Sequence, residues 1–198
     1  MIIGLTGGIA SGKSTVCKAL EDAGFIHIDA DDVAHSVLEE PEVIGRAVEL
    51  FGNDVLYARD DVRSPLMLDR KELGKIVFAD AEKMALWEGV THPRVVERIK
   101  EMIAADPDKN YVIEAIALIK SGLISICDEL WVVHAEPEQQ ISRLMSSRGL
   151  TREEAIARLE SQKDHDWDES KADHVIYSTE PVETMMLQVT EALKTCYD

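Results

Sequence analysis

The most constraining feature of the sequence is a glycine-rich run that begins at its seventh residue. Residues 7–14 read Gly-Gly-Ile-Ala-Ser-Gly-Lys-Ser and match the pattern G-x-x-x-x-G-K-S/T at every fixed position. A short apolar run at residues 2–6 precedes it, and a helical pattern over residues 14–20 follows. A chance glycine-rich turn would not require this order of strand, loop and helix. The sequence therefore predicts a P-loop, which wraps phosphate groups.

Each position of this loop has a chemical reason. Glycines at positions 7 and 12 have no Cβ, so the backbone can turn its N–H groups inward and approach a phosphate. Lys13 supplies a positive charge for the β- and γ-phosphates, and the Ser14 hydroxyl suits Mg²⁺. The expected nucleotide-binding residues form one stretch: Gly8, Ile9, Ala10, Ser11, Gly12, Lys13, Ser14 and Thr15. The sequence predicts a nucleoside triphosphate site.

The loop alone does not choose a reaction, because GTPases, motor ATPases and small-molecule kinases share it. A GTPase normally carries an Asn-Lys-x-Asp run after a late strand, and the sequence has no such run. The GTPase interpretation is therefore disfavoured.

Five short apolar runs predict the strands of one sheet. They cover residues 2–6, 25–28, 111–113, 130–133 and 175–177. Nearly all their residues are apolar and helical patterns separate them, which is typical of a parallel sheet buried on both faces. We therefore expect an α/β fold, a three-layer arrangement with a parallel five-stranded sheet, in a single domain over residues 1–198.

A long stretch between the second and third of these runs does not fit a simple crossover. Residues 32–106 contain no convincing strand, but they carry helical patterns over residues 70–78 and 81–103. Pro93 is expected to break the second of these helices. The stretch predicts a helical insertion.

A second stretch, residues 136–163, predicts a pair of helices that form a lid. The first helix should end at Gly149, and the run from Thr151 to Glu154 is a capping box for the next. The remaining core is then expected at about residues 1–31, 107–135 and 164–198. The lid carries four arginines that are candidates to neutralise charge on a triphosphate, although arginines on exposed helices are usually solvated. They are Arg143, Arg148, Arg152 and Arg158.

The charge, the cysteine spacing and the first residues of the sequence limit which partners, metal sites and locations are expected. Lys and Arg total 21 against 38 Asp and Glu, a formal net charge of −17, so we expect no nucleic-acid partner. The three cysteines lack the spacing of a zinc site or a disulfide framework. The first residues resemble neither a signal peptide nor a membrane span, so a cytoplasmic location without membrane association is expected. The sequence leaves the oligomeric state open.

Carboxylates follow the second predicted strand. Residues 29–32 read Asp-Ala-Asp-Asp, at the edge of the sheet where open α/β folds bind ligands. Asp31 or Asp29 is a candidate to accept a hydroxyl proton or to bind a water ligand of Mg²⁺. The alternative is that the cluster caps a helix beginning near Asp32. The two roles are compatible.

These motifs together resemble a known family. Residues 5–15, Leu-Thr-Gly-Gly-Ile-Ala-Ser-Gly-Lys-Ser-Thr, followed by Ile-Asp-Ala-Asp at residues 28–31, resemble the start of a bacterial dephospho-CoA kinase. The resemblance continues downstream at Phe51-Gly52, at residues 73–78, at His92-Pro93, at residues 140–145, at Gln162 and at Ala172-Asp173. It therefore covers nearly the whole chain.

The resemblance implies transfer of the γ-phosphoryl group of ATP, with Mg²⁺, to the ribose 3′-hydroxyl of dephospho-CoA, the final step of coenzyme A synthesis. It implies that Lys13 and Ser14 handle the triphosphate and Mg²⁺, and that Asp31 is the catalytic base at the acceptor. Arg143 resembles the catalytic arginine of the lid, and the insertion around His92 would hold the acceptor.

Some positions depart from the family pattern. Residues 116–120 read Ile-Ala-Leu-Ile-Lys where the family commonly reads Pro-Leu-Leu-Phe-Glu, so Lys120 replaces an acid. Arg148 is one position later than usual, and His134 stands where Asp is frequent. Two alternatives remain, a kinase for another nucleoside or nucleotide and a regulatory module that binds ATP without transferring its phosphate.

Overall fold

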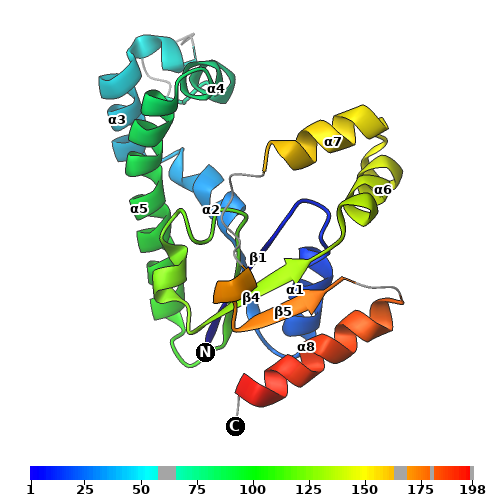
Figure 1. Ribbon diagram of the computed structural model, residues 1–198. Coiled ribbons are helices and arrows are strands. Elements are labelled where there is room, and N and C mark those ends of the chain that lie inside the picture. The colour runs from blue at the N-terminus through cyan, green and yellow to red at the C-terminus, as the bar shows by residue number, and fades with distance from the viewer. Residues whose placement is uncertain (58–65, 163–168, 179–180, 197–198) are drawn as a thin grey trace. The chain divides into compact units, whose positions relative to one another are not determined.

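The computed structural model describes residues 1–57, 66–162, 169–178 and 181–196. The chain divides into two compact units (Figure 1). One unit combines Met1–Asp29 with Asp106–Asp198, and the other is Ala30–Ala105. The first unit contains the sheet and the P-loop, and the second is helical.

The first unit is built on a sheet of five strands that are all parallel (Figure 1). The strands are β1 (Ile2–Gly7), β2 (Ile26–Asp29), β3 (Tyr111–Glu114), β4 (Glu129–His134) and β5 (His174–Tyr177). Their order across the sheet is β2-β3-β1-β4-β5. The predicted α/β class and the five-stranded parallel sheet are confirmed.

Both faces of the sheet are covered, which explains why the strands are short and apolar. On one face, Leu5 and Trp131 are fully buried in a core with residues of α1 (Lys13–Asp22) and α8 (Val182–Cys196). On the other face, Gly4 lies against Leu118 and Cys127, beside the short 3₁₀ helix Leu123–Ile126. A side chain at position 4 would collide with both residues, so glycine permits this close packing.

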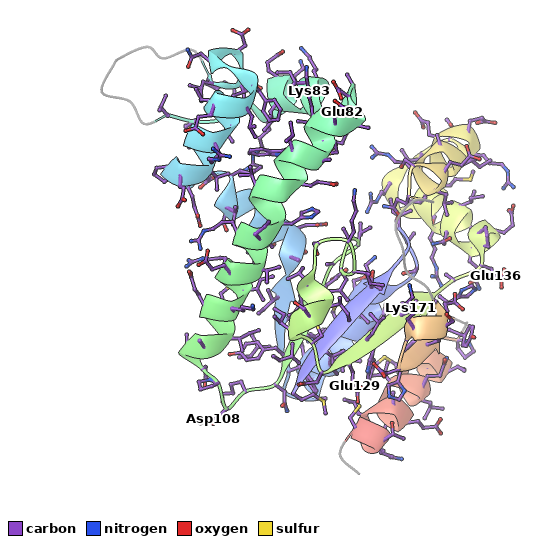
Figure 2. All side chains as sticks on the ribbon, turned by 60° about the vertical axis from the view of Figure 1, so that its left-hand side comes forward. Glu82, Lys83, Asp108, Glu129, Glu136 and Lys171 are labelled. Atoms are coloured by element: carbon purple, nitrogen blue, oxygen red, sulfur yellow. The ribbon has the colours of Figure 1, made fainter. Side chains whose placement is uncertain are left out.

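Residues 137–160 form two consecutive helices in the first unit. α6 (Pro137–Arg148) begins after Glu136 (Figure 2) and ends at Gly149, whose φ of 66° is left-handed. α7 (Arg152–Glu160) begins with a complete capping box between Thr151 and Glu154. Both predicted boundaries are confirmed, while residue 163, the predicted end of this region, lies outside the described residues.

The second unit contains four α-helices in the residues that the structure describes. They are α2 (Ala30–Val37), α3 (Pro41–Phe51), α4 (Arg70–Phe78) and α5 (Ala81–Ala105). A 3₁₀ turn covers Asn53–Val55, and the only pairing of β type among the unit's described residues is an isolated antiparallel bridge between Leu56 and Leu68. The predicted helical character of this stretch is confirmed, and α4 has the predicted bounds.

The predicted break at Pro93 is wrong, because α5, which is 25 residues long, continues through it to Ala105. Proline removes one backbone hydrogen bond and crowds the carbonyl group four residues earlier, which here belongs to Gly89. Buried residues on both sides of Pro93, Trp87 before it and Val95 and Ile99 after it, keep the helix packed within its unit. This packing offsets a cost of roughly 3 kcal/mol for an interior proline.

No helix in the described ranges combines the length and the apolar character that crossing a bilayer requires.

Candidate phosphate-binding site

The backbone of the P-loop uses conformations that favour glycine. Gly7 has φ of 146° and Gly12 has φ of 107°. A Cβ added at Gly7 would clash with the carbonyl oxygen of Val133, and one at Gly12 would lie 2.9 Å from the Ser178 hydroxyl. Ala10 is also left-handed, with φ of 56°. The two fixed glycines of the motif are therefore required by backbone conformation and by close packing.

Replacing Gly7 by alanine is expected to lower the free energy of unfolding by about 2 kcal/mol or more, because the new Cβ meets main chain and φ becomes strained. Urea denaturation measures this change. Gly45→Ala is the matched control, since a Cβ at this exposed helical position has no atom within 4 Å. A Gly7→Ala protein as stable as Gly45→Ala would contradict the assigned strain.

Lys13 is the first residue of α1, and its side chain is buried. The ammonium Nζ donates hydrogen bonds to the carbonyl oxygens of Gly7 (3.0 Å) and Gly8 (3.2 Å). These bonds hold the positive charge against the first turn of the loop. Because the amides at the start of α1 carry a partial positive charge, the site favours an anion.

Two hydroxyl groups of the loop differ in their surroundings. Ser11 is buried, and its Oγ has no hydrogen-bond partner among the described residues. A buried polar group in this position is costly unless a ligand satisfies it. Ser14 is exposed on the first turn of α1, so its hydroxyl is accessible to a hydrated cation. The first feature fits a phosphate ligand and the second fits Mg²⁺.

Residues that are distant in sequence fix the tip of the loop. Gln162 accepts a hydrogen bond from the Ile9 N–H (2.8 Å), and Gln140 of α6 donates one to the Ile9 carbonyl oxygen (2.9 Å). Ile9 and Ala10 also pack against a small apolar cluster formed by Ile141, Leu144 and Ala155. Both glutamines belong to the positions that resemble the family, but the sequence did not predict their contacts with Ile9, because only the folded chain brings them to the loop.

Arg143 of α6 contacts the loop from the same side. Its Nη1 donates to the carbonyl oxygens of Ala10 (3.1 Å) and Ser11 (3.2 Å) and to the Ser178 hydroxyl (2.9 Å). Ser178 follows β5 and backs Gly12, so one guanidinium group ties α6, the loop and the end of β5 together. The structure thus places Arg143 beside the loop.

Another lid arginine, Arg152, has a different environment. It pairs with Glu138 of α6 at 2.7 Å, and both side chains are at least half exposed. The hydrogen bond from Arg152 lowers the pKa of the Glu138 carboxyl group. The pair links α7 to α6 at the surface.

Two carboxylates mark the edge of the sheet. Asp29 ends β2, and its partner in register on β3 is Glu114, which in turn pairs with Leu5 of β1. Since the strands are parallel, these carboxylates lie at the same edge as the P-loop. The sequence did not single out Glu114, although its place at the end of an apolar run was a usable signal.

Asp31 and His92, the predicted acceptor-side residues, both belong to the helical unit. α2 begins at Ala30, slightly before the expected position near Asp32. Asp31 and Asp32 therefore lie in its first turn, where carboxylates interact favourably with the helix dipole. His92 is partly buried in the middle of α5.

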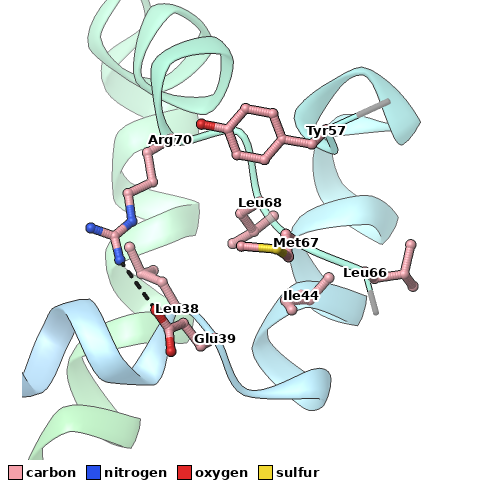
Figure 3. A pocket seen from close by; sticks show the side chains of 8 residues that line it. All are labelled: Leu38, Glu39, Ile44, Tyr57, Leu66, Met67, Leu68 and Arg70. Atoms are coloured by element: carbon pink, nitrogen blue, oxygen red, sulfur yellow. Dashed lines mark ion pairs between the residues drawn. The ribbon is translucent and has the colours of Figure 1, made fainter. Parts of the chain in front are cut away.

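The helical unit also contains a cavity of about 520 Å³ (Figure 3). Most of its lining is apolar, with one ion pair between Arg70 and Glu39 at 3.8 Å on one side. The lining residues are Leu38, Glu39, Ile44, Tyr57, Leu66, Met67, Leu68 and Arg70. Tyr57 and Met67 are each more than half exposed, so the cavity is open to solvent.

A parallel sheet of this order, with a P-loop after its first strand and a helix pair on the loop, defines a P-loop kinase. The sequence model of the dephospho-CoA kinase family matches residues 1–183. The dephospho-CoA kinase of Carboxydothermus hydrogenoformans is 36% identical over 98% of this chain and 93% of its own length. The chain therefore belongs to the dephospho-CoA kinase family.

Solved structures agree with this membership. A Thermus thermophilus protein has 29% identity and a TM-score of 0.81, covering 100% of this chain and 98% of that one. The dephospho-CoA kinase of Campylobacter jejuni has 27% identity and a TM-score of 0.59, covering 98% of this chain and 96% of that one. Family membership makes the chain a kinase and implies the last step of coenzyme A biosynthesis.

Proposed function

We propose that the chain transfers the γ-phosphoryl group of ATP to the ribose 3′-hydroxyl of dephospho-CoA. The observation that carries this proposal is a complete P-loop, with Lys13 held at its mouth, in a chain of the dephospho-CoA kinase family. In the reaction the acceptor oxygen forms a bond to the γ-phosphorus. The bond from that phosphorus to the bridging oxygen of ADP breaks.

The loop provides the donor side of the proposed reaction. Backbone amides from Gly8 to Thr15 bind the phosphates, the unpartnered Ser11 hydroxyl completes the cradle, and Lys13 stabilises charge on the β- and γ-oxygens. Ser14, exposed at the start of α1, would hold Mg²⁺. The bound ion would supply further charge neutralisation of the triphosphate.

Asp31 is the proposed base, and it accepts the proton of the acceptor hydroxyl. Support comes from its place two residues after the end of β2, which lies at the sheet edge of the P-loop. Asp29 is the alternative, because it occupies that edge itself. Mutation of each carboxylate separates the two.

We assign the acceptor to the helical unit, with His92 as a contact. The cavity lined by Tyr57 and Met67 (Figure 3) supports this assignment. Its lining is mostly apolar, and the pantetheine arm of the acceptor is long and largely apolar between its amides. We also propose that residues 136–163, which include α6 and α7, act as a lid. Its closure would exclude water from the transferred phosphoryl group.

A coupled assay that detects ADP tests the proposal directly. Purified protein with ATP and Mg²⁺ is expected to turn over only when dephospho-CoA is present. Adenosine, AMP and other nucleosides and nucleotides should be poor acceptors in the same assay. Turnover on these alone, or tight ATP binding without any product, would overturn the assignment.

Arg143→Ala is expected to lower kcat roughly 10²-fold, because the loop carbonyls lose their donor and the transferred phosphoryl group loses a nearby positive charge. Steady-state kinetics with saturating acceptor measure the change. Arg152→Ala is the matched control, since this lid arginine pairs with Glu138 at the surface, and it should stay within about twofold. Equal losses in both variants would contradict a specific role for Arg143.

A further inference from the structure

Three side chains with metal-binding atoms meet in the first unit, apart from the P-loop hydroxyls. They are Cys17 of α1, His27 of β2 and Glu114 at the end of β3. Glu114 Oε2 lies 3.2 Å from Cys17 Sγ and 3.2 Å from His27 Nε2. All three ligand atoms lie within 4.8 Å of one another.

The sheet register explains this convergence. Glu114 pairs with Asp29, and His27 precedes Asp29 by two residues on the same strand. Side chains two residues apart on a strand point to the same face, so His27 and Glu114 share a face. Cys17 belongs to the helix that covers this face, in the core with Leu5. Three rigid elements therefore hold the three side chains.

The state of His27 Nε2 suggests that these three side chains bind a ligand. The atom is buried, and although it lies near Glu114 Oε2, it has no hydrogen-bond partner among the described residues. The contact has the distance of a hydrogen bond without its geometry. The other ring nitrogen, Nδ1, lies 3.9 Å from the Glu21 carboxylate. A metal ion bound by Nε2 would satisfy this atom, and at Glu114 Oε2 it would replace the hydrogen bond that this oxygen accepts from Cys17 Sγ.

A second group of the same residue types shows the contrasting case. Glu129 at the start of β4 (Figure 2) lies near His174 and Cys196. Its Oε2 already accepts hydrogen bonds from Trp131 Nε1 (2.8 Å) and Cys196 Sγ (3.1 Å). His174 Nε2 lies 3.4 Å from the hydroxyl group of Thr195. These atoms have partners within the protein, so this group carries no inference.

We propose that Cys17, His27 and Glu114 bind a divalent transition-metal ion of the Zn²⁺ type. Zinc bonds of about 2.0–2.3 Å in tetrahedral geometry place ligand atoms roughly 3.3–3.6 Å apart. The two separations from Glu114 Oε2, 3.2 Å each, are close to this range, and the third lies within 4.8 Å. A water molecule would complete the coordination. Mg²⁺ prefers oxygen ligands and six-fold geometry, so this site is chemically distinct from the one proposed at Ser14.

Ion binding at this site must release a proton. Burial, and then the charge of Glu114, raise the pKa of the Cys17 thiol above its usual range, so the thiol is protonated before the ion arrives. The metal binds the thiolate, and the proton leaves to solvent. The ion then links α1 to β2 and β3. This inference does not depend on the proposed phosphoryl transfer.

The test is a titration of the reduced, chelator-treated full chain with Co²⁺, which reports thiolate ligation by a charge-transfer band in the near ultraviolet. The band should appear in the wild-type chain and disappear when Zn²⁺ is added. Cys17→Ser should abolish it, and His27→Asn should weaken Co²⁺ binding at least about tenfold. Cys196→Ser is the matched control and should retain the band, because it removes a thiol of the other group.

Absence of the band in the wild-type chain, or its loss in Cys196→Ser but not in Cys17→Ser, would overturn the site. Circular dichroism checks the folding of each variant. If Cys17→Ser does not fold, His27→Asn decides the question, since unchanged Co²⁺ affinity in that variant would equally refute the proposal.

Discussion

Replacing Lys13 by alanine is expected to lower kcat/KM for ATP at least about 10³-fold. The side chain is buried and its ammonium group is held by the carbonyl oxygens of Gly7 and Gly8, so no other described cation occupies that place in the loop. Without it, charge on the β- and γ-oxygens has lost its nearest partner. Calorimetry should show weaker ATP binding, and the coupled assay should show the lost turnover.

Lys18→Ala is the control for this experiment. Lys18 lies on the same helix, is exposed, and pairs with Asp22 at 2.8 Å. Its removal changes the net charge by the same amount without altering the loop, so kinetics should stay near those of the wild type. If the two variants retained similar activity, the P-loop would not be the ATP site.

Asp31→Asn is expected to reduce kcat roughly 10²–10⁴-fold while leaving the Kd for ATP unchanged. The amide keeps the size of the side chain but cannot accept the proton of the acceptor hydroxyl. Rapid-quench measurement of a single turnover separates this chemical step from product release. The nucleotide affinity, measured by calorimetry, checks that the donor site is intact.

Two neighbouring carboxylates serve as comparisons. Asp32→Asn alters the same first turn of α2 and should change kcat only a few-fold. Asp29→Asn alters the end of β2. A larger loss in Asp29→Asn than in Asp31→Asn would transfer the role of base to Asp29, and a weakened ATP Kd in Asp31→Asn would argue against a purely acceptor-side role.

The sheet could be predicted from the sequence because strands buried on both faces are runs of consecutive apolar residues. Four of the five strands contain a short, nearly continuous apolar run, whereas β2 alternates isoleucine with polar residues, and the P-loop motif fixes the position of the first strand. The end of α6 and the start of α7 could also be predicted, because Gly149 and the Thr151 capping box act over a few residues. Such signals are encoded by neighbours in the chain.

Interactions that depend on tertiary packing could not be read in this way. The helix through Pro93 persists because its buried face continues on both sides of the proline. The last helix, α8, was not predicted, although Met185, Val189 and Ala192 are buried at helical spacing. In α5, tertiary packing overrides the local preference of proline to end a helix. In α8, tertiary packing adds stability that local preference alone did not indicate.

In the candidate site, too, local features could be predicted from the sequence and long-range contacts could not. The motif identified the loop residues and Lys13, whose roles depend on local backbone geometry. The hydrogen bond between Ile9 and Gln162 joins residues 153 positions apart, and that between Arg143 and Ser11 joins residues 132 apart. A contact of this range leaves no pattern in a single sequence.

The hydrogen bonds from Gln140, Arg143 and Gln162 make the phosphate loop and the α6–α7 pair one thermodynamic system. A ligand that prefers one arrangement of the loop must also shift the equilibrium of the helices bonded to it, and by reciprocity the helices alter the ligand's affinity by the same factor. Nucleotide affinity is therefore expected to depend in part on Gln140 and Gln162, whose hydrogen bonds go to the backbone of the loop.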